Sequence, residues 1–399
     1  MKILQINCVY KKGSTGKIVY DIHTELTRRN IESVVCYGRG ASSHDDNIYK
    51  TCGELYSKFN NLLSRFTGIM YGGCLLSTAR LISIIKKEKP DIVHLHCING
   101  YFVNVYRLVT WLKTNKIKTV VTLHAEFLFT ANCGYAFECD KWMTGCGNCP
   151  RCKEETKSYI IDNTKKSWKM MKKAFDNFSD SCCITSVSPW LINRAKQAPI
   201  LQNLQHETVL NGIDTDIFHP YSNSELRSQY GINSKVLIVH VNPSFSLDKN
   251  HIKGGYYVVE LAKKMPDVMF AIIGCSSDIE GLPDNVINIG RIEDQHKLAE
   301  WYSVADLTLL TSKRETFSMI TAESMCCGTP VVGFMAGGPE SIAIEEYSKF
   351  VEYGNVDSLA DAAYSMINNP IKLDTVFASQ KYSKARMTDE YISIYKRML

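Results

Sequence analysis

The 399-residue sequence lacks long apolar runs. No stretch of about 18 apolar residues occurs, and this absence excludes a membrane-spanning helix. The apolar segment at the amino terminus is too short for a signal peptide, because Gln5 and Asn7 interrupt it. Internal repeats, low-complexity tracts and Gly/Ser linkers are also missing. We therefore expect an intracellular, cytoplasmic protein.

Two familiar nucleotide-binding motifs are absent as well. The sequence has no G-x-x-x-x-G-K-[ST] phosphate-binding loop. Its first predicted strand leads into KKGSTGKI, in which Gly13 and Gly16 let the backbone approach an anion closely, but this stretch is not G-x-G-x-x-G. The second predicted strand ends in YGRGASS, without the acidic residue that holds an adenosine ribose. A nicotinamide cofactor is therefore disfavoured.

Acidic residues are scarce in the first half of the chain. Residues 1–200 hold 29 Lys/Arg against 16 Asp/Glu, a net charge of +13, whereas residues 201–399 hold 17 against 25, a net charge of −8. A basic half of this kind favours an anionic partner. Solvated surface lysines explain part of the excess.

Short apolar runs rich in β-branched residues alternate with longer helical patterns along nearly the whole chain. This alternation is typical of parallel sheets with crossover helices. The first series of predicted strands comprises residues 2–8, 33–38, 91–97, 119–124 and 182–188, and the second comprises 235–242, 269–274, 286–292, 307–312 and 330–335. The sequence therefore predicts an α/β protein with two Rossmann-like, parallel-sheet domains in tandem.

The boundary between the two series falls near VLNGIDTDIFHP, where Gly212 favours a turn. We predict an N-terminal domain over residues 1–208 and a C-terminal domain over 209–381. In the last segment, 382–399, apolar residues recur at helical spacing, which predicts a helix that packs back on the N-terminal domain. The stripe consists of Met387, Tyr391, Ile394, Tyr395 and Met398.

A pair of carboxylates follows the predicted strand 307–312. Glu315 lies in the loop after this strand and Glu323 on the next predicted helix. Parallel sheets bind ligands at the carboxyl ends of their strands, so these side chains are placed to bind a nucleotide ribose and the group attached to it. The following strand ends in Gly337 and Gly338, whose N–H groups suit a phosphate or a sugar hydroxyl. On these residues alone, an ordinary surface or helix-stabilising role for the two glutamates stays open.

The stretch E-x-F-S-x-x-x-x-E, followed by G-T-P-V-V and G-G-P-E, resembles retaining glycosyltransferase family 4. GSTGKI, PDIVHLH, TVVTLH, VLNGIDTDIFHP and HIKGG occur in the order of that family, so the resemblance covers essentially the whole chain. It implies the GT-B fold, in which two Rossmann-like domains face each other across a cleft. It also implies transfer of a hexose-type sugar from a nucleotide-sugar to a glycan hydroxyl, with no cofactor for catalysis.

The resemblance implies a role for each matching residue. Glu323 would bind the ribose, Glu315 the donor sugar and its leaving phosphate, and Lys253 the diphosphate. The loop Gly13–Gly16 would lie beside the donor phosphate and the acceptor, and His124 would bind the donor sugar. The glycines after the 330–335 strand would complete the donor site. A fixed cation and backbone N–H groups suit this chemistry because negative charge develops on the departing diphosphate.

The sequence departs from the family pattern at two positions. Family members commonly have an arginine after the strand 235–242, and this chain has NPSFSLDKNHIKGG instead. Either Lys249, His251 or the Ser244 hydroxyl would take its place, or the diphosphate would be held with less charge. Many relatives have His-Asp where this chain reads TLHAEF. We expect Glu126 to take that acceptor-side role.

Five of the fifteen cysteines fall in the segment CGYAFECDKWMTGCGNCPRC. The C-x₂-C pair is a common half of a tetrahedral zinc site, and two further thiols precede it. A structural zinc ion bound by Cys133, Cys139, Cys146 and Cys149 and a set of reduced, packed thiols both stay open. The insert resembles that of a subgroup that acts in bacterial surface-polysaccharide assembly, and we expect it to shape the entrance for the acceptor.

A lysine-rich helix is predicted after the cysteine segment. Its apolar face combines Ile161, Trp168, Met171 and Phe175, and lysines fill the remainder. Such a helix suits an anionic membrane surface, and residues 55–89 are a second candidate. A polyprenyl-diphosphate-linked glycan acceptor would require transient, peripheral contact with the inner face of the membrane. Packing of the helix on its own domain is the alternative.

Two other functions remain open on the sequence. A GT-B nucleotide-sugar epimerase would turn over the donor without an acceptor. A non-catalytic binder of anionic glycolipid or nucleic acid would explain the missing arginine, although no nucleic-acid recognition motif is present and we expect no nucleic-acid partner.

Overall fold

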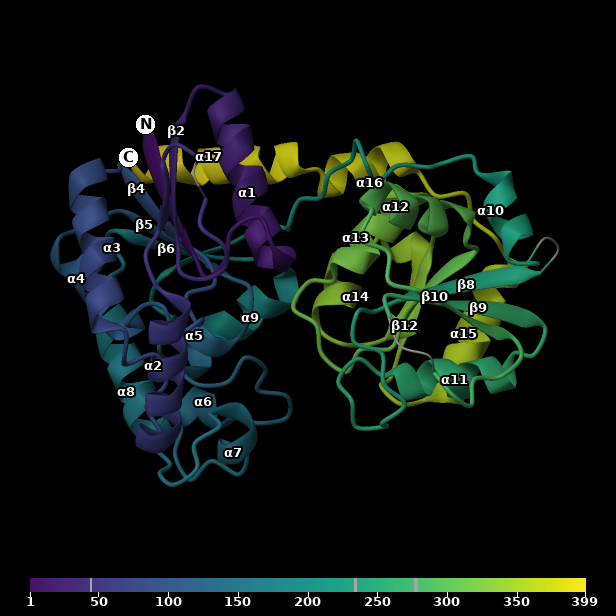
Figure 1. The fold of residues 1–399 in the computed structure, drawn as a ribbon, viewed down its shortest axis with the longest axis horizontal. Helices are drawn as coiled ribbons and strands as arrows, with labels where there is room; N and C mark the ends of the chain where they lie inside the picture. Colours follow the sequence, from purple (N-terminus) through teal and green to yellow (C-terminus); the bar gives the residue numbers. More distant parts are fainter. Residues whose placement is uncertain (44, 233–234, 276–278) are drawn as a thin grey trace. The chain divides into compact units, whose positions relative to one another are not determined.

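In the computed structural model the chain forms two compact units, shown in Figure 1. Unit 1 comprises residues 1–210 and 387–399, and unit 2 comprises 211–386. The structure describes residues 1–43, 45–232, 235–275 and 279–399. Each unit is built on one parallel sheet with helices, so the predicted two-sheet α/β organisation is confirmed.

Unit 1 contains, within the described residues, a seven-stranded sheet with the order β3-β2-β1-β4-β5-β6-β7. All neighbouring strands are parallel. The strands are β1 (Lys2–Asn7), β2 (Glu32–Tyr37), β3 (Ile48–Lys50), β4 (Ile92–Leu95), β5 (Thr119–Leu123), β6 (Cys182–Ser186) and β7 (Gln205–Thr208). The helices are α1 (Gly13–Arg28), α2 (Glu54–Thr67), α3 (Leu75–Glu88), α4 (Val105–Thr114), α5 (Phe127–Thr130), α6 (Lys141–Thr144), α7 (Cys152–Glu155), α8 (Thr164–Phe175), α9 (Pro189–Gln197) and most of α17 (Lys384–Met398).

Unit 2 contains, in the part of the chain that the structure describes, a six-stranded parallel sheet with the order β10-β9-β8-β11-β12-β13. The strands are β8 (Val236–Val241), β9 (Val268–Ile273), β10 (Val286–Gly290), β11 (Leu307–Leu310), β12 (Val331–Phe334) and β13 (Ser348–Val351). The helices are α10 (Ser224–Gln229), α11 (Gly255–Lys264), α12 (Gln295–Val304), α13 (Met319–Cys326), α14 (Gly338–Ile342), the 3₁₀ turn η1 (Glu345–Tyr347), α15 (Val356–Asn368) and α16 (Thr375–Tyr382).

The central strands are buried along their whole length because helices cover both faces of each sheet. Every residue of β5, β6, β9, β11 and β12 is buried. Continuous burial removes the alternation of polar and apolar residues and leaves runs of Val, Ile and Leu. These runs are the signal that located the strands in the sequence.

The carboxy-terminal helix α17 covers a face of unit 1. Met387, Tyr391, Ile394 and Tyr395 are at most 2% exposed, and only Met398 of the predicted stripe is half-exposed. Between α17 and the sheet, the Tyr395 hydroxyl hydrogen-bonds Nδ1 of His94 on β4 at 2.7 Å, and the Tyr391 hydroxyl hydrogen-bonds Thr122 on β5 at 2.9 Å. Buried hydrogen bonds therefore fix the register of α17 on the sheet.

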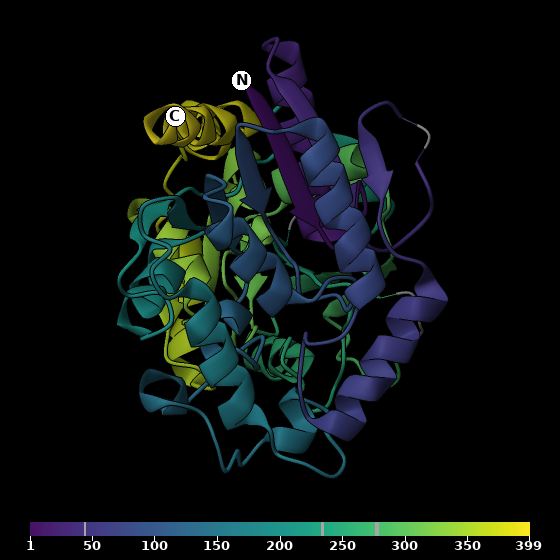
Figure 2. The same cartoon turned by 90° about the vertical axis from the view of Figure 1, so that its left-hand side faces the viewer.

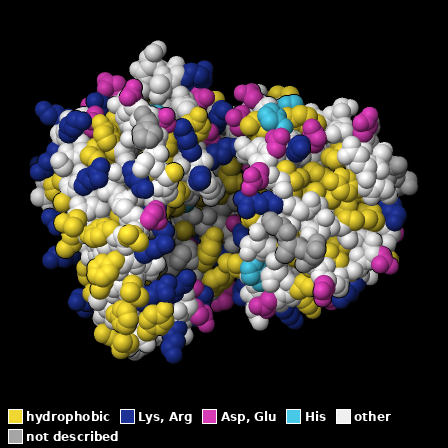
Figure 3. All heavy atoms as spheres, in the orientation of Figure 1, with side chains coloured by type: hydrophobic (Ala, Val, Ile, Leu, Met, Phe, Trp, Pro, Cys, Tyr) yellow, Lys and Arg dark blue, Asp and Glu magenta, His cyan; other side chains and the backbone are white. Residues whose placement is uncertain are grey.

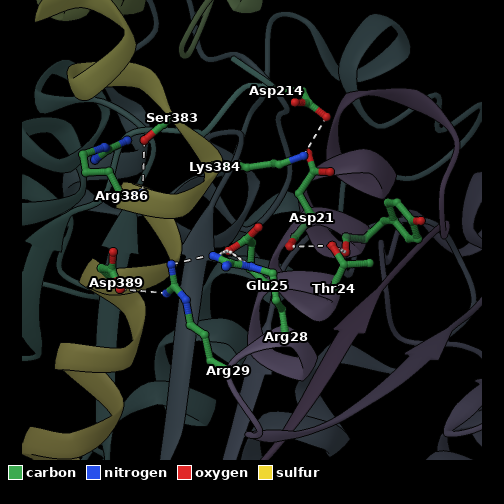
Figure 4. A network of polar contacts seen from close by, with 11 residues as sticks. Asp21, Thr24, Glu25, Arg28, Arg29, Asp214, Ser383, Lys384, Arg386 and Asp389 are labelled. Atoms are coloured by element: carbon green, nitrogen blue, oxygen red, sulfur yellow. Dashed lines mark hydrogen bonds and ion pairs between the residues drawn. The ribbon is translucent and has the colours of Figure 1, made fainter. Parts of the chain in front are cut away.

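An ion pair links α17 to the end of α1. Arg29, the residue after α1, contacts Asp389 of α17 at 2.7 Å and Glu25 of α1 at 3.4 Å, as Figure 4 shows. Glu25 also accepts a hydrogen bond from Arg28 at 2.8 Å. These pairs are partly exposed and contribute orientation more than stability.

The two segments at which the chain enters and leaves unit 2 lie side by side. The N–H of Ile213 donates to the carbonyl of Tyr382 at 2.8 Å, and the N–H of Lys384 donates back to Ile213 at 2.9 Å. Gly212 is required here, because a Cβ would lie 2.5 Å from Cα of Lys384. Lys384 also pairs with Asp214 at 2.6 Å, a contact drawn in Figure 4.

The lysine-rich helix α8 packs into unit 1. Trp168, Met171 and Phe175 are at most 8% exposed, and Ile161 lies outside the helix. The prediction that this apolar face meets a membrane is therefore wrong, and the alternative of packing on its own domain is right. The lysines of α8 lie on its exposed side.

Candidate active site

The carboxyl edge of the unit 2 sheet gathers the polar residues that the sequence singled out. The loop after β8 carries Ser244 and Lys253, the loop after β11 carries Glu315, and the loop after β12 carries Gly337 and Gly338. The chain connections diverge at β8, which lies between β9 and β11. Ligands of open α/β sheets bind at such a point, so this edge is the candidate site in unit 2.

Lys253 and Glu315 form an ion pair at this edge. Nζ of Lys253 contacts Oε1 of Glu315, and the two side chains are 34% and 19% exposed. Both groups are therefore reachable by a ligand. An ammonium group that is paired with a single carboxylate has donors left for an anion such as a diphosphate.

Gly254 fixes the position of Lys253. The glycine has φ +67°, and a Cβ on it would lie 2.1 Å from the carbonyl oxygen of Thr311. The Thr311 hydroxyl donates to the carbonyl of Lys253 at 3.0 Å, and the N–H of Lys313 donates to Ile252 at 2.8 Å. The loops after β8 and β11 thus pass in direct contact, and only glycine fits between them.

The backbone of Glu315 pairs with the loop after β12. The N–H of Glu315 donates to Ala336 at 3.1 Å, and its carbonyl accepts from the N–H of Gly338 at 2.9 Å. The N–H of Gly337 donates to Oε1 of Glu340 at 2.7 Å. Both glycine N–H groups are therefore bonded within the protein, and the prediction that they bind a phosphate or sugar hydroxyl is not met in this conformation. Gly338 instead permits close approach, since a Cβ would lie 2.3 Å from the carbonyl carbon of Thr316.

Glu323 is a nearly buried carboxylate on α13. It is 8% exposed, and its Oε2 accepts a hydrogen bond from the hydroxyl of Tyr302 at 3.3 Å. Burial, and then the Glu323 charge, raise the pKa of Tyr302 well above its ordinary value, so the phenol stays protonated and donates. Ser318, with φ +86°, caps the helix by accepting from the N–H of Thr321 at 3.2 Å.

Sequence reasoning missed Tyr302. It lies on α12 within an ordinary apolar pattern, and its contact with Glu323 spans 21 residues. No local motif could have indicated this pair. The helix α13 begins at Met319, so that Glu323 lies about one turn from its start.

The loop after β8 offers polar groups where an arginine was expected. The Ser244 hydroxyl and Nε2 of His251 are 3.4 Å apart, and Asn242 accepts from the N–H of Ser244 at 2.9 Å. Nζ of Lys249 lies over the ring of Tyr256, 5.8 Å from its centroid. Ser244 and His251 are thus the pair that this loop holds together.

In unit 1, the glycine loop follows β1. Gly13 has φ +66° and open space around its Cα, whereas a Cβ on Gly16 would lie 3.1 Å from Val9. The N–H of Lys11 donates to the carbonyl of Gly16 at 3.1 Å, which closes the turn before α1. Lys11 pairs with Asp45 at 2.8 Å. The loop is therefore compact, with its exposed backbone at Gly13.

Three histidines lie at the carboxyl ends of β4 and β5. His94 and His96 are fully buried, and His124 is half-buried. Nδ1 of His96 and Nε2 of His124 are 3.2 Å apart, so one ring donates and the other accepts. Burial lowers the pKa of His124 to about 4. His124 is therefore neutral near neutral pH and can donate a hydrogen bond to an uncharged sugar hydroxyl.

The structure corrects the prediction for Glu126. This side chain is 0% exposed, and its Oε2 accepts from the N–H of Ala136 at 2.8 Å and from Arg194 at 3.3 Å. The guanidinium of Arg194 also lies over the rings of Trp142 and Trp190, at 5.1 Å and 5.2 Å. A carboxylate enclosed in this way anchors the cysteine segment and does not reach an acceptor. Arg194 was missed because it is 68 residues away in the sequence.

The five cysteines of the insert are half-buried thiols. Burial raises the pKa of Cys146 to about 12, with smaller effects of Cys139 and Cys149. Burial likewise raises the pKa of Cys133, on which Cys149, Cys146 and Cys139 also act. The charges of the other three proposed ligands therefore act on Cys133. Within the described residues, no three His, Cys, Asp or Glu side chains are arranged to hold a metal ion.

Two family models match the chain. Residues 15–217 match the model described as Glycosyltransferase Family 4, and residues 222–384 match Glycosyl transferases group 1. N-acetyl-alpha-D-glucosaminyl L-malate synthase of Bacillus anthracis is 24% identical over 307 residues, covering 74% of this chain and 70% of that protein. A glycosyl transferase named for colanic acid biosynthesis, WcaC of Escherichia coli K12, is 21% identical over the full length of both chains.

Solved structures share the fold. HepE of Anabaena in complex with UDP superposes with a TM-score of 0.67 at 15% identity and covers 100% of both chains. Sucrose-phosphate synthase of Thermosynechococcus elongatus superposes with a TM-score of 0.64 at 15% identity, covering 100% of this chain and 99% of that one. HepE has also been solved with UDP-glucose.

The two parallel-sheet units and these matches define a GT-B glycosyltransferase. The chain belongs to glycosyltransferase family 4. It is therefore an enzyme of the EC 2.4 class that uses a nucleotide-sugar donor. In the part of the chain that the structure describes, no helix combines the length and hydropathy that a membrane span needs.

Proposed function

We propose that this enzyme transfers a hexose-type sugar, with retention of configuration, from a nucleotide-sugar to a hydroxyl of a polyprenyl-diphosphate-linked glycan. The observation that carries the proposal is the partly exposed Lys253–Glu315 ion pair in the same unit as the nearly buried Glu323. The full-length similarity to a transferase named for colanic acid biosynthesis supports a role in polysaccharide assembly.

The donor binds at the carboxyl edge of the unit 2 sheet in this proposal. Glu323 accepts the ribose hydroxyls, and Tyr302 orients its carboxylate through their hydrogen bond. Lys253 binds the diphosphate, and Glu315 binds the donor sugar. Binding of the diphosphate would loosen the Lys253–Glu315 pair, which frees the Glu315 carboxylate for sugar hydroxyls.

The chemical step needs no dedicated base. The glycosyl–phosphate bond breaks and its electron pair leaves with the diphosphate, while the acceptor oxygen bonds to the anomeric carbon on the same face. The acceptor proton passes to the departing phosphate oxygen. The ammonium of Lys253 stabilises the negative charge that grows on this oxygen, and such an interaction strengthens in the transition state.

Unit 1 supplies the sugar and acceptor contacts in the proposal. His124, kept neutral by its low pKa, donates to a donor-sugar hydroxyl. Gly13, which has open space around it, would contact the donor phosphate and the acceptor through its backbone. In unit 2, Ser244 with His251 takes the place of the arginine that relatives have. Transient contact with the inner face of the membrane brings the enzyme to a lipid-linked acceptor.

The cysteine insert has a structural part in this proposal. Cys133, Cys139, Cys146 and Cys149 would bind zinc as thiolates, which requires the loss of protons that burial otherwise retains. Zinc there would cross-link the insert and supply no step of the transfer. Mass-spectrometric metal analysis of protein purified without chelators tests it: about one zinc per chain is expected, and a metal-free insert contradicts it.

A donor screen tests the proposed transfer. Thermal unfolding is measured with UDP-, GDP- and other nucleotide-sugars, because a ligand that binds only the folded state raises the midpoint. The stabilising donor is then supplied with lipid-linked glycans, and the product configuration is read by NMR. A product with inverted configuration, or donor turnover without acceptor as in an epimerase, would overturn the proposal.

A further inference from the structure

Helix α2 presents its apolar face to solvent. The residues that it buries are Ser57, Asn60 and Ser64. The opposite face carries Leu55, Phe59, Leu62, Leu63 and Phe66, which are 83%, 57%, 48%, 42% and 49% exposed. An ordinary surface helix has the reverse arrangement, with its apolar stripe against the core. Figure 2 shows α2 along one margin of unit 1.

Hydrogen bonds to the polar face hold α2 in this orientation. Oδ1 of Asn60 accepts from the N–H of Cys74 at 2.7 Å, and the Ser57 hydroxyl donates to Gly100 at 3.3 Å. The chain passes so close that a Cβ on Gly73 would lie 2.4 Å from Asn60 Oδ1. Rotation of α2 to bury its apolar face would break both bonds and leave the Cys74 N–H unpaired.

The apolar surface continues onto two neighbouring segments. The N–H of Tyr159 donates to Arg65 at 3.0 Å, and a Cβ on Gly68 would lie 2.2 Å from the carbonyl oxygen of Ile161, so residues 159–161 lie against the end of α2. Their side chains are 57%, 73% and 46% exposed. At the other end, the N–H of Leu76 donates to the Tyr56 hydroxyl at 3.2 Å, and Leu76 is 73% exposed.

This surface, called the apolar patch below, consists of the outward face of α2, residues 159–161 and the first turn of α3. Figure 3 shows hydrophobic side chains gathered over α2 with basic side chains among and beside them. Contiguous exposed apolar surface of this kind is uncommon on a monomeric protein and marks an interaction site.

Basic residues border the apolar patch. Residues 151–173 hold eight Lys/Arg against three Asp/Glu. Helix α8 follows the patch in the chain. Its residues Lys165, Lys166, Lys169 and Lys173, together with the single carboxylate of Asp162, line a surface hollow of about 470 Å³. The hollow is large enough for a phosphate-bearing group, and its lysines favour negative charge.

Charge and shape together favour a lipid bilayer as the partner. A second copy of the chain would bring two lysine-rich borders together, and like charges oppose such a contact. The patch is a convex helix face and not a groove. A convex apolar helix face can insert into the boundary between headgroups and acyl chains. Anionic headgroups would neutralise the lysines at the same time.

We propose that the apolar patch inserts into an anionic membrane surface while the lysines of α8 bind lipid headgroups. The biological reason for this membrane binding rests on the proposed lipid-linked acceptor. The evidence for the apolar patch itself does not depend on the substrate. The proposal assigns the insertion to residues 159–161 and to α2, which falls almost wholly within the second candidate segment 55–89, whereas the first candidate in the sequence was the apolar face of α8.

Vesicle co-sedimentation of the full chain tests the proposal. The probes are phosphatidylcholine vesicles with and without phosphatidylglycerol. The test variant is Phe59→Glu/Leu63→Glu, on the outward face of α2. The matched control is Val376→Glu/Phe377→Glu on α16, whose side chains are 65% and 49% exposed in unit 2. All four substituted side chains are exposed, so both variants are expected to fold, and far-ultraviolet circular dichroism checks this.

The proposal predicts that the wild type and the control bind vesicles with phosphatidylglycerol, and that the α2 variant binds about tenfold or more weakly. A variant with Lys165, Lys166 and Lys169 changed to alanine should lose the preference for phosphatidylglycerol. Equal binding by the wild type and the α2 variant overturns the proposal. A wild type that does not bind vesicles, or that dimerises through α2, overturns it as well.

Failure of this inference is distinguishable from failure of the proposed function. Transfer to a water-soluble acceptor analogue should be unchanged in the α2 variant, because the substitutions lie outside the candidate active site. Transfer without lipid binding would refute the inference alone, and lipid binding without transfer would refute the proposed function alone.

Discussion

Replacement of Gly254 by alanine tests how the active-site lysine is positioned. Gly254 precedes α11 with φ +67°, and an added Cβ would lie 2.1 Å from the Thr311 carbonyl oxygen, where ordinary contacts begin at 3.4 Å. Gly231 has the same φ of +67° but open space around it, so Gly231→Ala is a matched control. The difference between the two variants isolates the collision from the backbone conformation.

The expected magnitudes follow from these two effects. An alanine in the left-handed region costs about 1–2 kcal/mol, which both variants share. Relief of the collision requires the loops after β8 and β11 to separate, and an overpacked site of this kind costs a further 1–3 kcal/mol or so. Because Lys253 adjoins Gly254, its ammonium shifts with the loop, and a shift of about 1 Å lowers kcat/KM by up to roughly a hundredfold.

Urea denaturation and transfer kinetics measure the two consequences. Gly231→Ala should lose a little stability and keep wild-type transfer, and Gly254→Ala should lose more stability and most of its transfer. If the two variants have the same stability and the same kcat/KM, the close contact between the two loops does not position Lys253 and the reasoning fails.

Three further predictions concern buried groups. Tyr302→Phe removes the hydrogen bond to Glu323 and should weaken donor binding by about threefold to tenfold with little change in stability, as calorimetry can measure. Arg194→Met leaves the Glu126 carboxylate buried without its cation and should cost about 3–5 kcal/mol in urea denaturation. Burial lowers the pKa of His240 to about 4, so folded His240 binds fewer protons than unfolded His240 below about pH 6.5. Stability should therefore fall as the pH drops from about 6.5 towards 4, with a contribution of about 2 kcal/mol from His240 near pH 5.

Each of these predictions has a result that would contradict it. Unchanged donor affinity in Tyr302→Phe would show that the hydroxyl does not orient the carboxylate. For the buried ion pair, the double variant Glu126→Gln/Arg194→Met should recover part of the stability, and no recovery would contradict the pairing. For the pH effect, His240→Gln should show a smaller loss of stability between about pH 7 and pH 5 than the wild type; an equal loss would refute the assignment.

The central strands were predictable because a strand that is buried on both faces of a sheet consists mainly of consecutive apolar residues. The strands β3, β7 and β13 were not predicted. Each lies at a sheet edge, is three or four residues long and contains polar residues. An edge strand has fewer neighbours to exclude water, so its sequence does not differ from that of a loop.

Those residues of the candidate site whose location follows from their position after a strand were predictable. Lys253 and Glu315 follow strands of one sheet, and parallel connectivity brings the ends of those strands to one edge. The roles of Glu126 and of the glycine N–H groups were not predictable in this way. They depend on partners such as Arg194 and Glu340, whose side chains are placed by tertiary packing.

The inverted orientation of α2 was also hidden in the sequence. Residues 55–89 were predicted as the second candidate for a helix that contacts a membrane surface. The periodicity of a helix separates an apolar from a polar face, but it does not determine which of the two faces packs against the protein. The hydrogen bond from the Cys74 N–H to Asn60 holds the polar face of α2 against the protein. Such a contact is visible only once the chain is folded.

Transfer kinetics of Lys253→Ala test the central claim most directly, because the Lys253 ammonium is proposed to stabilise the negative charge that develops on the departing diphosphate. Lys263→Ala is the matched control, since Lys263 lies on the adjoining helix α11 and pairs with Glu260 at 2.8 Å in the same unit. Loss of the partly exposed pair with Glu315 should cost at most about 1 kcal/mol of stability. We predict that kcat falls by about a hundredfold or more in Lys253→Ala with the protein still folded, and that Lys263→Ala transfers as the wild type does. Full transfer by folded Lys253→Ala would contradict the account.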